Sequence, residues 1–385
     1  GGNVYYGSGV QTINLAGGSD AIITAGSGTG TGGHYDPDCF AVLGNACRGS
    51  SNGATIENGI GDQVLNFTPG GSLTVTGGGS GTQNWAGVEN KGGSQAIYGS
   101  PNITLTGGSG GGDALTYGGV LFEKSNDAGI YTDGGGTQYI TAGTLTIDGG
   151  TAVWGGAGIS NDSGVGGITI VTSGNMSMYG GSSNAAAPHA TAAHVHNSGA
   201  GPISIDVGGD LYIRAGSGSS GPALIGSVDG PANVHIFTAP GKNIFMQAAA
   251  GDVLVGSASD DGGANVQIES GGNLITDSTG LGMVRIGSHS NVVGPTNVAL
   301  NARGDIGLGA STRVGVDSPG PNPNGGTVRM VAGWDTGTGF TAQANTLAGY
   351  GSITIDGGTI RTGGGSFGAY ASDNIHLGHV YTDAM

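Results

Sequence analysis

The sequence repeats with a period of about 30 residues, a length found in solenoids, and this repeat limits the folds that the chain can adopt. The segment Asn233–Ile236 recurs as Asn265–Ile268 and, at the same spacing, as Asn297–Leu300. Each segment precedes a second and a third short apolar unit, the third units being Val255–Ser257, Ile286–Ser288 and Val314–Val316. A repeat that contains only short strands and turns is typical of a solenoid. We therefore interpret each period as one coil of a β-helix with three strands.

The apolar residues within each unit favour the same fold. Val234 and Ile236 alternate with polar residues, which is the pattern of a strand with one buried face. A single coil cannot bury that face, but stacked coils bury it as continuous columns of apolar side chains. We therefore predict an all-β fold, a single-stranded parallel β-helix of about 11–12 coils with a rise of about 4.8 Å per coil. In that fold Val234, Val266 and Val298 lie directly above one another.

The repeat also predicts the organisation of the whole chain. The leading strands start at Ile168, Ile203, Val234, Val266, Val298 and Val328, with a last unit at Ile353–Ile355. We expect one solenoid domain over residues 1–385, made of an N-terminal coil or cap (1–60), irregular decorated coils (61–165) and regular coils (166–385). The segments Ala114–Asp133 and Ala185–Val195 interrupt the pattern, and we expect both to be insertions at a corner.

Asparagine and aspartate recur at the start of the repeated strands. Side chains at equivalent positions of stacked coils can bond to one another along the rod, so we expect two polar ladders. The recurrence favours ladders over the simpler explanation that Asn and Asp are turn residues. One ladder contains Asn233, Asn265 and Asn297, and the other contains Asn175, Asp210, Asn243, Asn273 and Asp305.

The composition narrows the possible partners. The chain has 88 glycines, which fit tight corners between strands, and only 10 Lys and Arg residues against 26 Asp and Glu residues. Its net charge of −16 argues against nucleic acid and against an anionic membrane surface. No apolar run is long enough to span a bilayer, so we expect no membrane insertion. The first residue is Gly1, and we expect the chain to be a piece of a longer secreted precursor.

The two cysteines, Cys39 and Cys47, lie close together in a loop rich in Gly, Asp and Pro. In an exported protein this spacing favours a local disulfide, with two free thiols as the alternative. Zinc is disfavoured because His34 is the only further ligand nearby.

Candidate catalytic and metal-binding residues are few. His189, His194 and His196 form an HxxxxHxH cluster in which the last two would share a strand face, as a metal site needs, although surface histidines also explain it. A polysaccharide lyase or glycoside hydrolase on a β-helix would need convergent carboxylates with aromatic residues. Glu123 with Asp127 and Asp133 is the best such group in the sequence. We expect no cofactor and no enzymatic activity, and keep a carbohydrate-active β-helix as the alternative.

Residues 166–316 resemble a known family. The segments Gly208–Gly218 and Ala223–Ser227, and the later Gly271–Leu274 with Arg285–Ser288, are similar to the repeats of filamentous-haemagglutinin-like adhesins. These are large proteins that Gram-negative bacteria secrete by the two-partner route. The resemblance implies a right-handed β-helical rod at the cell surface that acts in adhesion and matrix building. Asn322–Gly325 matches a motif of that family's secretion domain but stands late in the chain, and we interpret it as a turn.

Both ends of a solenoid expose strand edges, which are templates for pairing with another chain. The residues at the two ends are apolar and alternate like strands: Val4, Tyr5, Tyr6, Ile375, Leu377, Val380 and Tyr381. We therefore expect an extracellular structural protein that assembles end to end with its own copies, with host or surface glycans and proteins as further partners.

Overall fold

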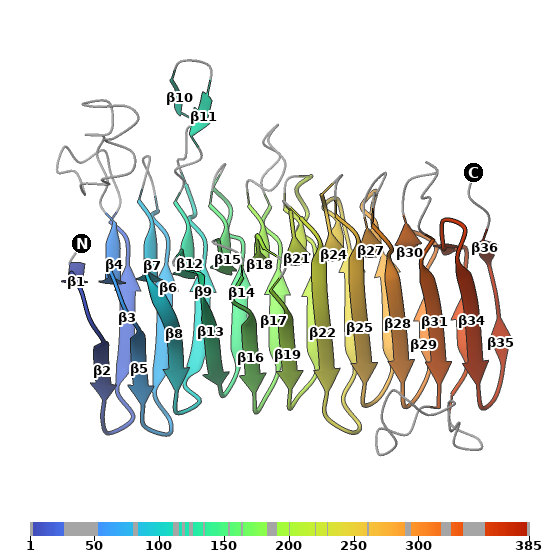
Figure 1. The fold of residues 1–385 in the computed structure, drawn as a ribbon, viewed down its shortest axis with the longest axis horizontal. Helices are drawn as coiled ribbons and strands as arrows, with labels where there is room; N and C mark the ends of the chain where they lie inside the picture. The colour runs from blue at the N-terminus through green and yellow to red at the C-terminus, as the bar shows by residue number, and fades with distance from the viewer. Residues whose placement is uncertain are drawn as a thin grey trace.

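The computed structural model describes residues 3–26, 53–79, 84–110, 115–117, 120–122, 126–133, 135–152, 155–162, 165–182, 191–199, 201–219, 221–228, 230–259, 262–288, 294–316, 325–333 and 351–382. These ranges contain strands and no helix. Three long parallel sheets contain 12, 11 and 11 strands, and, once the separate hairpin β10–β11 is set aside, every third strand along the chain is a neighbour in the same sheet. The predicted all-β solenoid with three strands per coil is therefore confirmed (Figure 1).

Sheet A contains the third unit of each repeat. It consists of β1 (Asn3–Tyr6), β4 (Ala54–Asn58), β7 (Ala86–Asn90), β12 (Ala128–Thr132), β15 (Ala157–Asn161), β18 (Ala193–Asn197), β21 (Ala223–Ser227), β24 (Val253–Ser257), β27 (Val284–Ser288), β30 (Thr312–Val316), β33 (Thr359–Arg361) and β36 (His379–Tyr381).

Sheet B contains the leading strands of the repeat. It consists of β2 (Gln11–Leu15), β5 (Gln63–Phe67), β8 (Gly93–Tyr98), β13 (Gly135–Ala142), β16 (Ile168–Thr172), β19 (Ile203–Val207), β22 (Ala232–Thr238), β25 (Ala264–Ser270), β28 (Asn297–Ala302), β31 (Thr327–Ala332) and β34 (Ser366–Ala371).

Sheet C contains the second unit of each repeat. It consists of β3 (Asp20–Thr24), β6 (Ser72–Thr76), β9 (Asn102–Thr106), β14 (Leu145–Asp148), β17 (Met176–Tyr179), β20 (Leu211–Arg214), β23 (Ile244–Ala248), β26 (Leu274–Ser278), β29 (Ile306–Leu308), β32 (Ile353–Ile355) and β35 (Ile375–His376).

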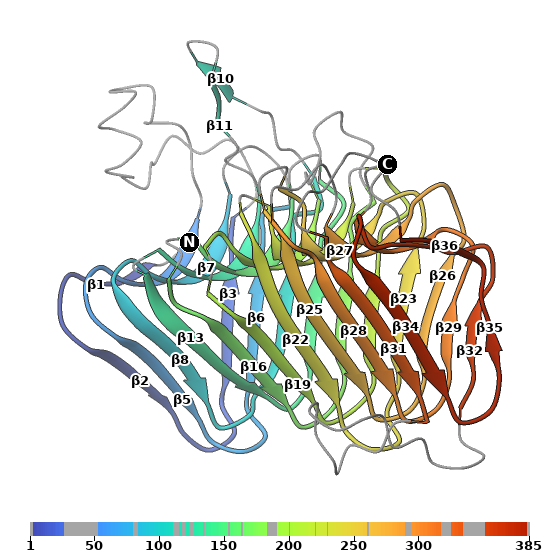
Figure 2. The same ribbon diagram turned by 45° about the vertical axis from the view of Figure 1, so that its right-hand side comes forward.

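The direction of winding follows from the two ribbon views. In Figure 1 the chain runs down through sheet B on the near side and up through sheet C on the far side while it advances from N to C. Figure 2, with the right-hand side turned forward, places the same two sheets on the same sides of the stack. The coils therefore wind in the right-handed sense, which is also the sense that parallel strand crossovers favour.

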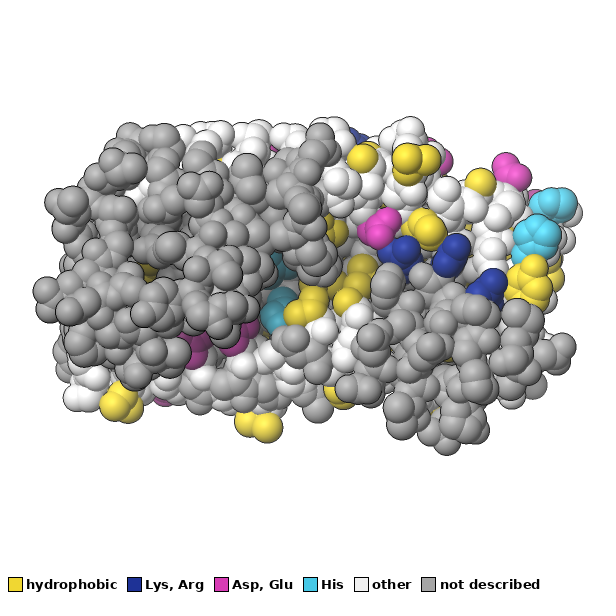
Figure 3. Space-filling view, turned by 90° about the horizontal axis from the view of Figure 1, so that it is seen from above, with side chains coloured by type: hydrophobic (Ala, Val, Ile, Leu, Met, Phe, Trp, Pro, Cys, Tyr) yellow, Lys and Arg dark blue, Asp and Glu magenta, His cyan; other side chains and the backbone are white. Residues whose placement is uncertain are grey.

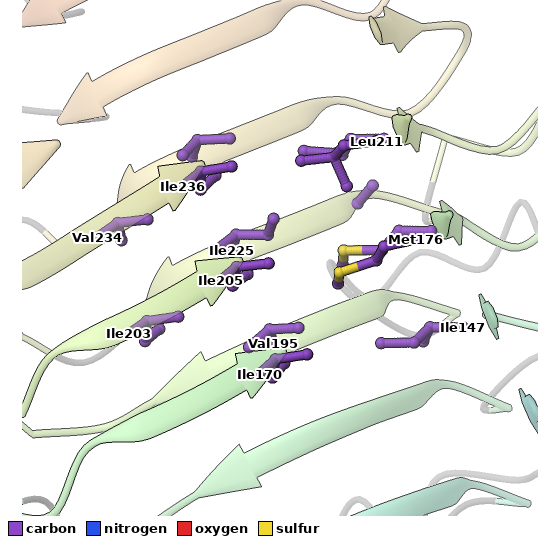
Figure 4. Packing of buried hydrophobic residues seen from close by; sticks show 14 of the residues in the cluster. Ile147, Ile170, Met176, Val195, Ile203, Ile205, Leu211, Ile225, Val234 and Ile236 are labelled. Atoms are coloured by element: carbon purple, nitrogen blue, oxygen red, sulfur yellow. The ribbon is translucent and has the colours of Figure 1, made fainter. Parts of the chain in front are cut away.

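The register between coils places equivalent residues directly above one another. Val234 pairs with Val266, and Val266 pairs with Val298, as the spacing of the repeat predicts. The inward side chains of all three sheets meet in one core, in which Ile205 and Ile236 of sheet B face Ile225 of sheet A and Leu211 of sheet C (Figure 4). Each coil buries its apolar face on the coils above and below, which a single coil could not do.

A column of glycines explains the third unit of the repeat. Gly226, Gly256, Gly287 and Gly315 are stacked in sheet A, each with a positive φ between 97° and 148°. A Cβ at Gly226 would lie 1.7 Å from the carbonyl oxygen of Gly256 in the next coil. Only glycine combines this backbone conformation with so close an approach between coils, so the Gly in each Val-Gly-Ser or Ile-Gly-Ser unit is required by the stacking.

Three expectations for individual segments were wrong in detail. The unit Ile353–Ile355 belongs to sheet C, where Ile353 pairs with Ile306, and β34 takes the expected place in sheet B. The two expected insertions, Ala114–Asp133 and Ala185–Val195, end in strands β12 and β18 of sheet A. Strands of all three sheets show the same alternation, so the pattern does not tell which sheet a strand joins, and the glycine and alanine in β12 and β18 obscure it.

The part of the insertion that precedes β12 contains a short antiparallel hairpin. Its strands are β10 (Leu115–Tyr117) and β11 (Val120–Phe122), and Leu115 pairs with Phe122. Figures 1 and 2 both show the hairpin standing away from the stack on the side of sheet A.

We expect one core substitution to separate buried from exposed isoleucines of the same coil. Ile268 in β25 is fully buried, whereas Ile275 in β26 is 37% exposed on the outer face. Ile268→Ala should lower the free energy of unfolding by about 2–5 kcal/mol, because it leaves a cavity between coils. Ile275→Ala should change it by less than about 1 kcal/mol. Urea unfolding followed by circular dichroism measures both, and equal effects would contradict a core made of stacked inward columns.

Candidate functional site

A polar ladder runs along the start of sheet C. The Oδ1 atom of Asn175 accepts a hydrogen bond from the backbone N–H of Asp210 at 2.9 Å, and Asp210 accepts one from Asn243 at 2.8 Å. The series continues in the same way through Asn273, Asp305 and Ser352, with N···O distances of 2.8 Å at each step. The ladder therefore binds each coil to the next through side-chain oxygen and backbone nitrogen.

This geometry differs from the predicted amide-to-amide ladder and explains the residue types. The requirement is an acceptor oxygen on Cγ, which Asn and Asp both supply, so the two residues are interchangeable along the column. In the other predicted ladder, Asn233, Asn265 and Asn297 are in register in sheet B. There the amide of Asn265 does donate to Asn233 at 3.3 Å, whereas Asn297 accepts from the backbone N–H of Thr327 at 3.1 Å.

A third ladder lies inside the rod and was missed. The side-chain amides of four stacked glutamines bond to one another at 2.8–2.9 Å, and all four residues are buried: Gln11, Gln63, Gln95 and Gln138. In the next coil the same position holds Ile168, so the polar column gives way to an aliphatic one. The intervals between the glutamines are 52, 32 and 43, too irregular for the repeat to reveal. The available signal was that each glutamine stands two residues before an inward aliphatic residue, as Gln95 does before Ile97.

The outer face of sheet A gathers ionisable groups near the N-terminal end. Glu57, Glu89, Tyr131, Ser160 and His196 occupy one column of successive strands. The ammonium of Lys91 lies 3.5 Å from a carboxylate oxygen of Glu57 and 3.8 Å from one of Glu89. Figure 3, which looks down on this side, shows acidic and histidine side chains close together.

Burial changes the acid–base properties of this cluster. It raises the pKa of Glu89 to about 8, against the opposing effect of Lys91 and with support from Asp133 and Glu57. Burial lowers the pKa of Lys91, but Glu89 and Glu57 outweigh that effect, so the pKa lies above its ordinary value. Burial, with Asp127 and Asp162 nearby, also raises the pKa of Tyr131. At neutral pH one carboxyl group of the cluster therefore retains its proton.

The predicted histidine cluster is only partly described. His194 and His196 both point outward from β18 as expected, but His189 lies outside the described residues. The Nε2 of His194 lies 3.3 Å from the hydroxyl of Ser160, and the Nδ1 of His196 lies 3.3 Å from the carbonyl oxygen of Gly226. Among the described residues no three His, Cys, Asp or Glu side chains are grouped as metal ligands.

Several predicted sites cannot be placed. Cys39, Cys47, Glu123 and the turn residues 322–324 lie outside the described ranges. Asp127 and Asp133, which were grouped with Glu123 in the sequence, flank β12 and lie near Tyr131.

The predicted assembly residues belong to the last coils at each end. Val4 is 54% exposed in β1, where the backbone of Tyr5 and Tyr6 is described but their side chains are not. At the other end Ile375, Leu377 and Tyr381 are more than 40% exposed, while Val380 packs against the core. The strands β1, β2 and β3, and likewise β34, β35 and β36, are the outermost strands of their sheets.

The fold and these sites define the class of the protein, a right-handed parallel β-solenoid with polar ladders along its length. Comparison with protein-family models, with curated proteins and with solved structures finds no match. The resemblance to filamentous-haemagglutinin-like repeats therefore remains a prediction. The described part of the chain also contains no helix that could cross a membrane.

The ladder of sheet C makes a prediction about residue type. Asp210→Asn should leave the free energy of unfolding within about 1 kcal/mol of the native value, because the acceptor oxygen is kept. Asp210→Leu should lower it by about 1–3 kcal/mol, because the backbone N–H of Asn243 loses its partner. Urea unfolding of the two variants provides the comparison. If Asn destabilised the chain as much as Leu does, a ladder based on the acceptor oxygen would be wrong.

The raised pKa of Glu89 predicts a pH dependence of stability. The folded chain binds this proton more tightly than the unfolded chain, whose carboxyl has an ordinary value of 4.5. The stabilising contribution is therefore complete below pH 4.5 and is lost as the pH rises through about 8. Between pH 5 and pH 9 the free energy of unfolding should fall by on the order of 4 kcal/mol more in the native chain than in Glu89→Gln.

The control for this measurement is Asp356→Asn, which removes an exposed carboxylate at the other end of the rod. It should keep the native pH profile of urea unfolding. A profile that is the same in the native chain and in Glu89→Gln would show that Glu89 titrates normally.

Proposed function

We propose that this chain is a structural segment of an extracellular rod at the bacterial cell surface, a filament or an adhesin, and that it stacks end to end with a second copy. The observation that carries the proposal is the incomplete burial of inward side chains in the terminal coils. At both ends inward residues of the outermost strands are only half-buried against the core, including Ile13, Leu15, Phe367 and Ala369. A further coil in register would bury them.

The backbone of the outermost strands also fits a further coil. The stack is parallel, and in the part of the chain that the structure describes its one register shift lies between β8 and β13, away from both ends, so the last strand of each sheet presents the backbone donors and acceptors of an internal parallel strand. Among the described residues no helix covers either end. An open edge of this kind is a template for pairing with another chain.

The secreted and adhesive parts of the proposal rest on composition and on the family resemblance. Only 9% of the residues are charged, so the surface of the rod depends largely on uncharged side chains. Adhesion then depends on the surfaces that project from the rod on the side of sheet A. Surface glycans and proteins are the partners that this role implies.

The experiment compares two lysine substitutions in one strand. Ile13→Lys puts a charge on the inner face of β2, where the next coil would pack, and Thr12→Lys puts the same charge on the outer face. In electron micrographs and sedimentation velocity at increasing concentration, the native chain and Thr12→Lys should form rods of growing length. Ile13→Lys should shorten them at least tenfold while its circular dichroism stays native. A native chain that stays monomeric at high concentration would refute stacking.

A further inference from the structure

The cluster on the outer face of sheet A has the components of a hydrolytic site. The carboxyl groups of Glu89 and Asp133 are joined by a hydrogen bond, which requires a proton on one of them. Glu57, in the adjacent strand, is paired with Lys91. The site thus holds an acid, Glu89, beside a carboxylate, Glu57, and two such groups with different protonation states are what acid–base hydrolysis requires.

Two buried oxygen atoms at the site have no hydrogen-bond partner among the described residues. One is Oε2 of Glu89, and the other is the hydroxyl of Thr55, a residue only 2% exposed. Thr55 shares the outward face of β4 with Glu57, two positions further along the strand. Buried polar atoms are nearly always paired, so these two indicate a ligand that supplies hydroxyl groups.

Aromatic rings lie over the glycines of the sheet beside the carboxylates. Gly87, Gly129 and Gly158 are in register in adjacent strands and leave the outer face without side chains. The ring of Trp85 lies over Gly87, and the ring of Tyr131 lies over Gly129, within 3.2 Å and 2.2 Å of where a Cβ would be. Rings next to acidic groups are suited to a ligand with both apolar faces and hydroxyl groups, as a sugar has.

One side of the cluster borders exposed residues. Asp133 and Asp162, which directly follow strands β12 and β15, are exposed, whereas Glu57 and Glu89 are nearly covered. This corner of the coil is therefore the side of the cluster nearest to solvent. The surrounding carboxylates and the net charge of −16 would repel a polyanion.

We propose that this cluster hydrolyses the glycosidic bond of a neutral glycan. Glu89 gives its proton to the oxygen of the scissile bond as the C–O bond breaks. A water molecule forms the new C–O bond at the anomeric carbon and gives its proton to Glu57, so that one water is consumed and two hydroxyl ends are formed. The cluster recovers when Glu57 releases that proton to solvent and Glu89 regains one. Lys91 is a positioning residue, since it holds the two carboxyl groups together. This activity goes beyond the structural role and runs against the expectation of a non-catalytic chain.

The test uses the full chain with a panel of soluble neutral polysaccharides (glucans, mannans, galactans and xylans) and measures release of reducing ends. Glu89→Gln and Glu57→Gln should each lower the rate at least a hundredfold. The control Glu269→Gln, which changes a carboxylate on the outer face of sheet B, should leave it unchanged. The native rate should fall as the pH rises above about 8, where Glu89 loses its proton.

Three results would overturn the proposal. The first is that the chain cleaves no neutral glycan and binds none on a glycan array. The second is that it cleaves anionic glycans faster than neutral ones, and the third is that Glu89→Gln keeps full activity. Native circular dichroism of both Gln variants separates loss of chemistry from loss of fold. Electron micrographs of Glu89→Gln should show rods of native length, so failure of this site and failure of end-to-end stacking are distinguishable.

Discussion

Parallel pairing of each coil with the next, in register, is the interaction on which the rest of this structure depends. It places equivalent residues above one another, so a residue type that recurs once per coil forms a continuous column along the rod. Aliphatic side chains then form the core, glycines such as Gly256 allow a close approach between successive coils, and Asn or Asp supplies an acceptor to the next coil. No coil is stable alone, because its inner face is buried only by its neighbours.

The ladders show how a rod poor in charge holds polar groups in and around its core. Each glutamine of the inner column satisfies its neighbours and also bonds backbone carbonyl oxygens, as the Gln95 amide does with Val88. A buried amide without such partners would cost about 1–3 kcal/mol. The polar column occupies the first coils only and gives way to Ile168, so the two halves of the rod differ in their interior.

The outer faces of the three sheets are not equivalent. Among the described residues, sheet A alone combines stacked glycines, aromatic rings over them and a group of ionisable residues that includes a protonated carboxyl, and the hairpin β10–β11 stands on its side (Figure 1). A rod and a site on one of its faces are compatible, because the coil stack supplies rigidity while the outward positions are free to vary. The proposed glycan chemistry and the proposed assembly therefore use different surfaces, one lateral and one axial.

The sequence by itself determined the fold class, the three strands per coil and the columns around Val266, because a regular spacing of short alternating apolar units has few other solutions. It also indicated where the Asn and Asp ladders lie, since they follow the same spacing. Only the tertiary structure decided the bonding within them, the buried glutamines and the cluster at Glu89. Glu57 and Glu89 do stand 32 residues apart, one period of the repeat, but Tyr131 follows after a longer interval, and the repeat does not tell which of these side chains are buried together. Their proton affinity depends on burial, which no local sequence pattern records.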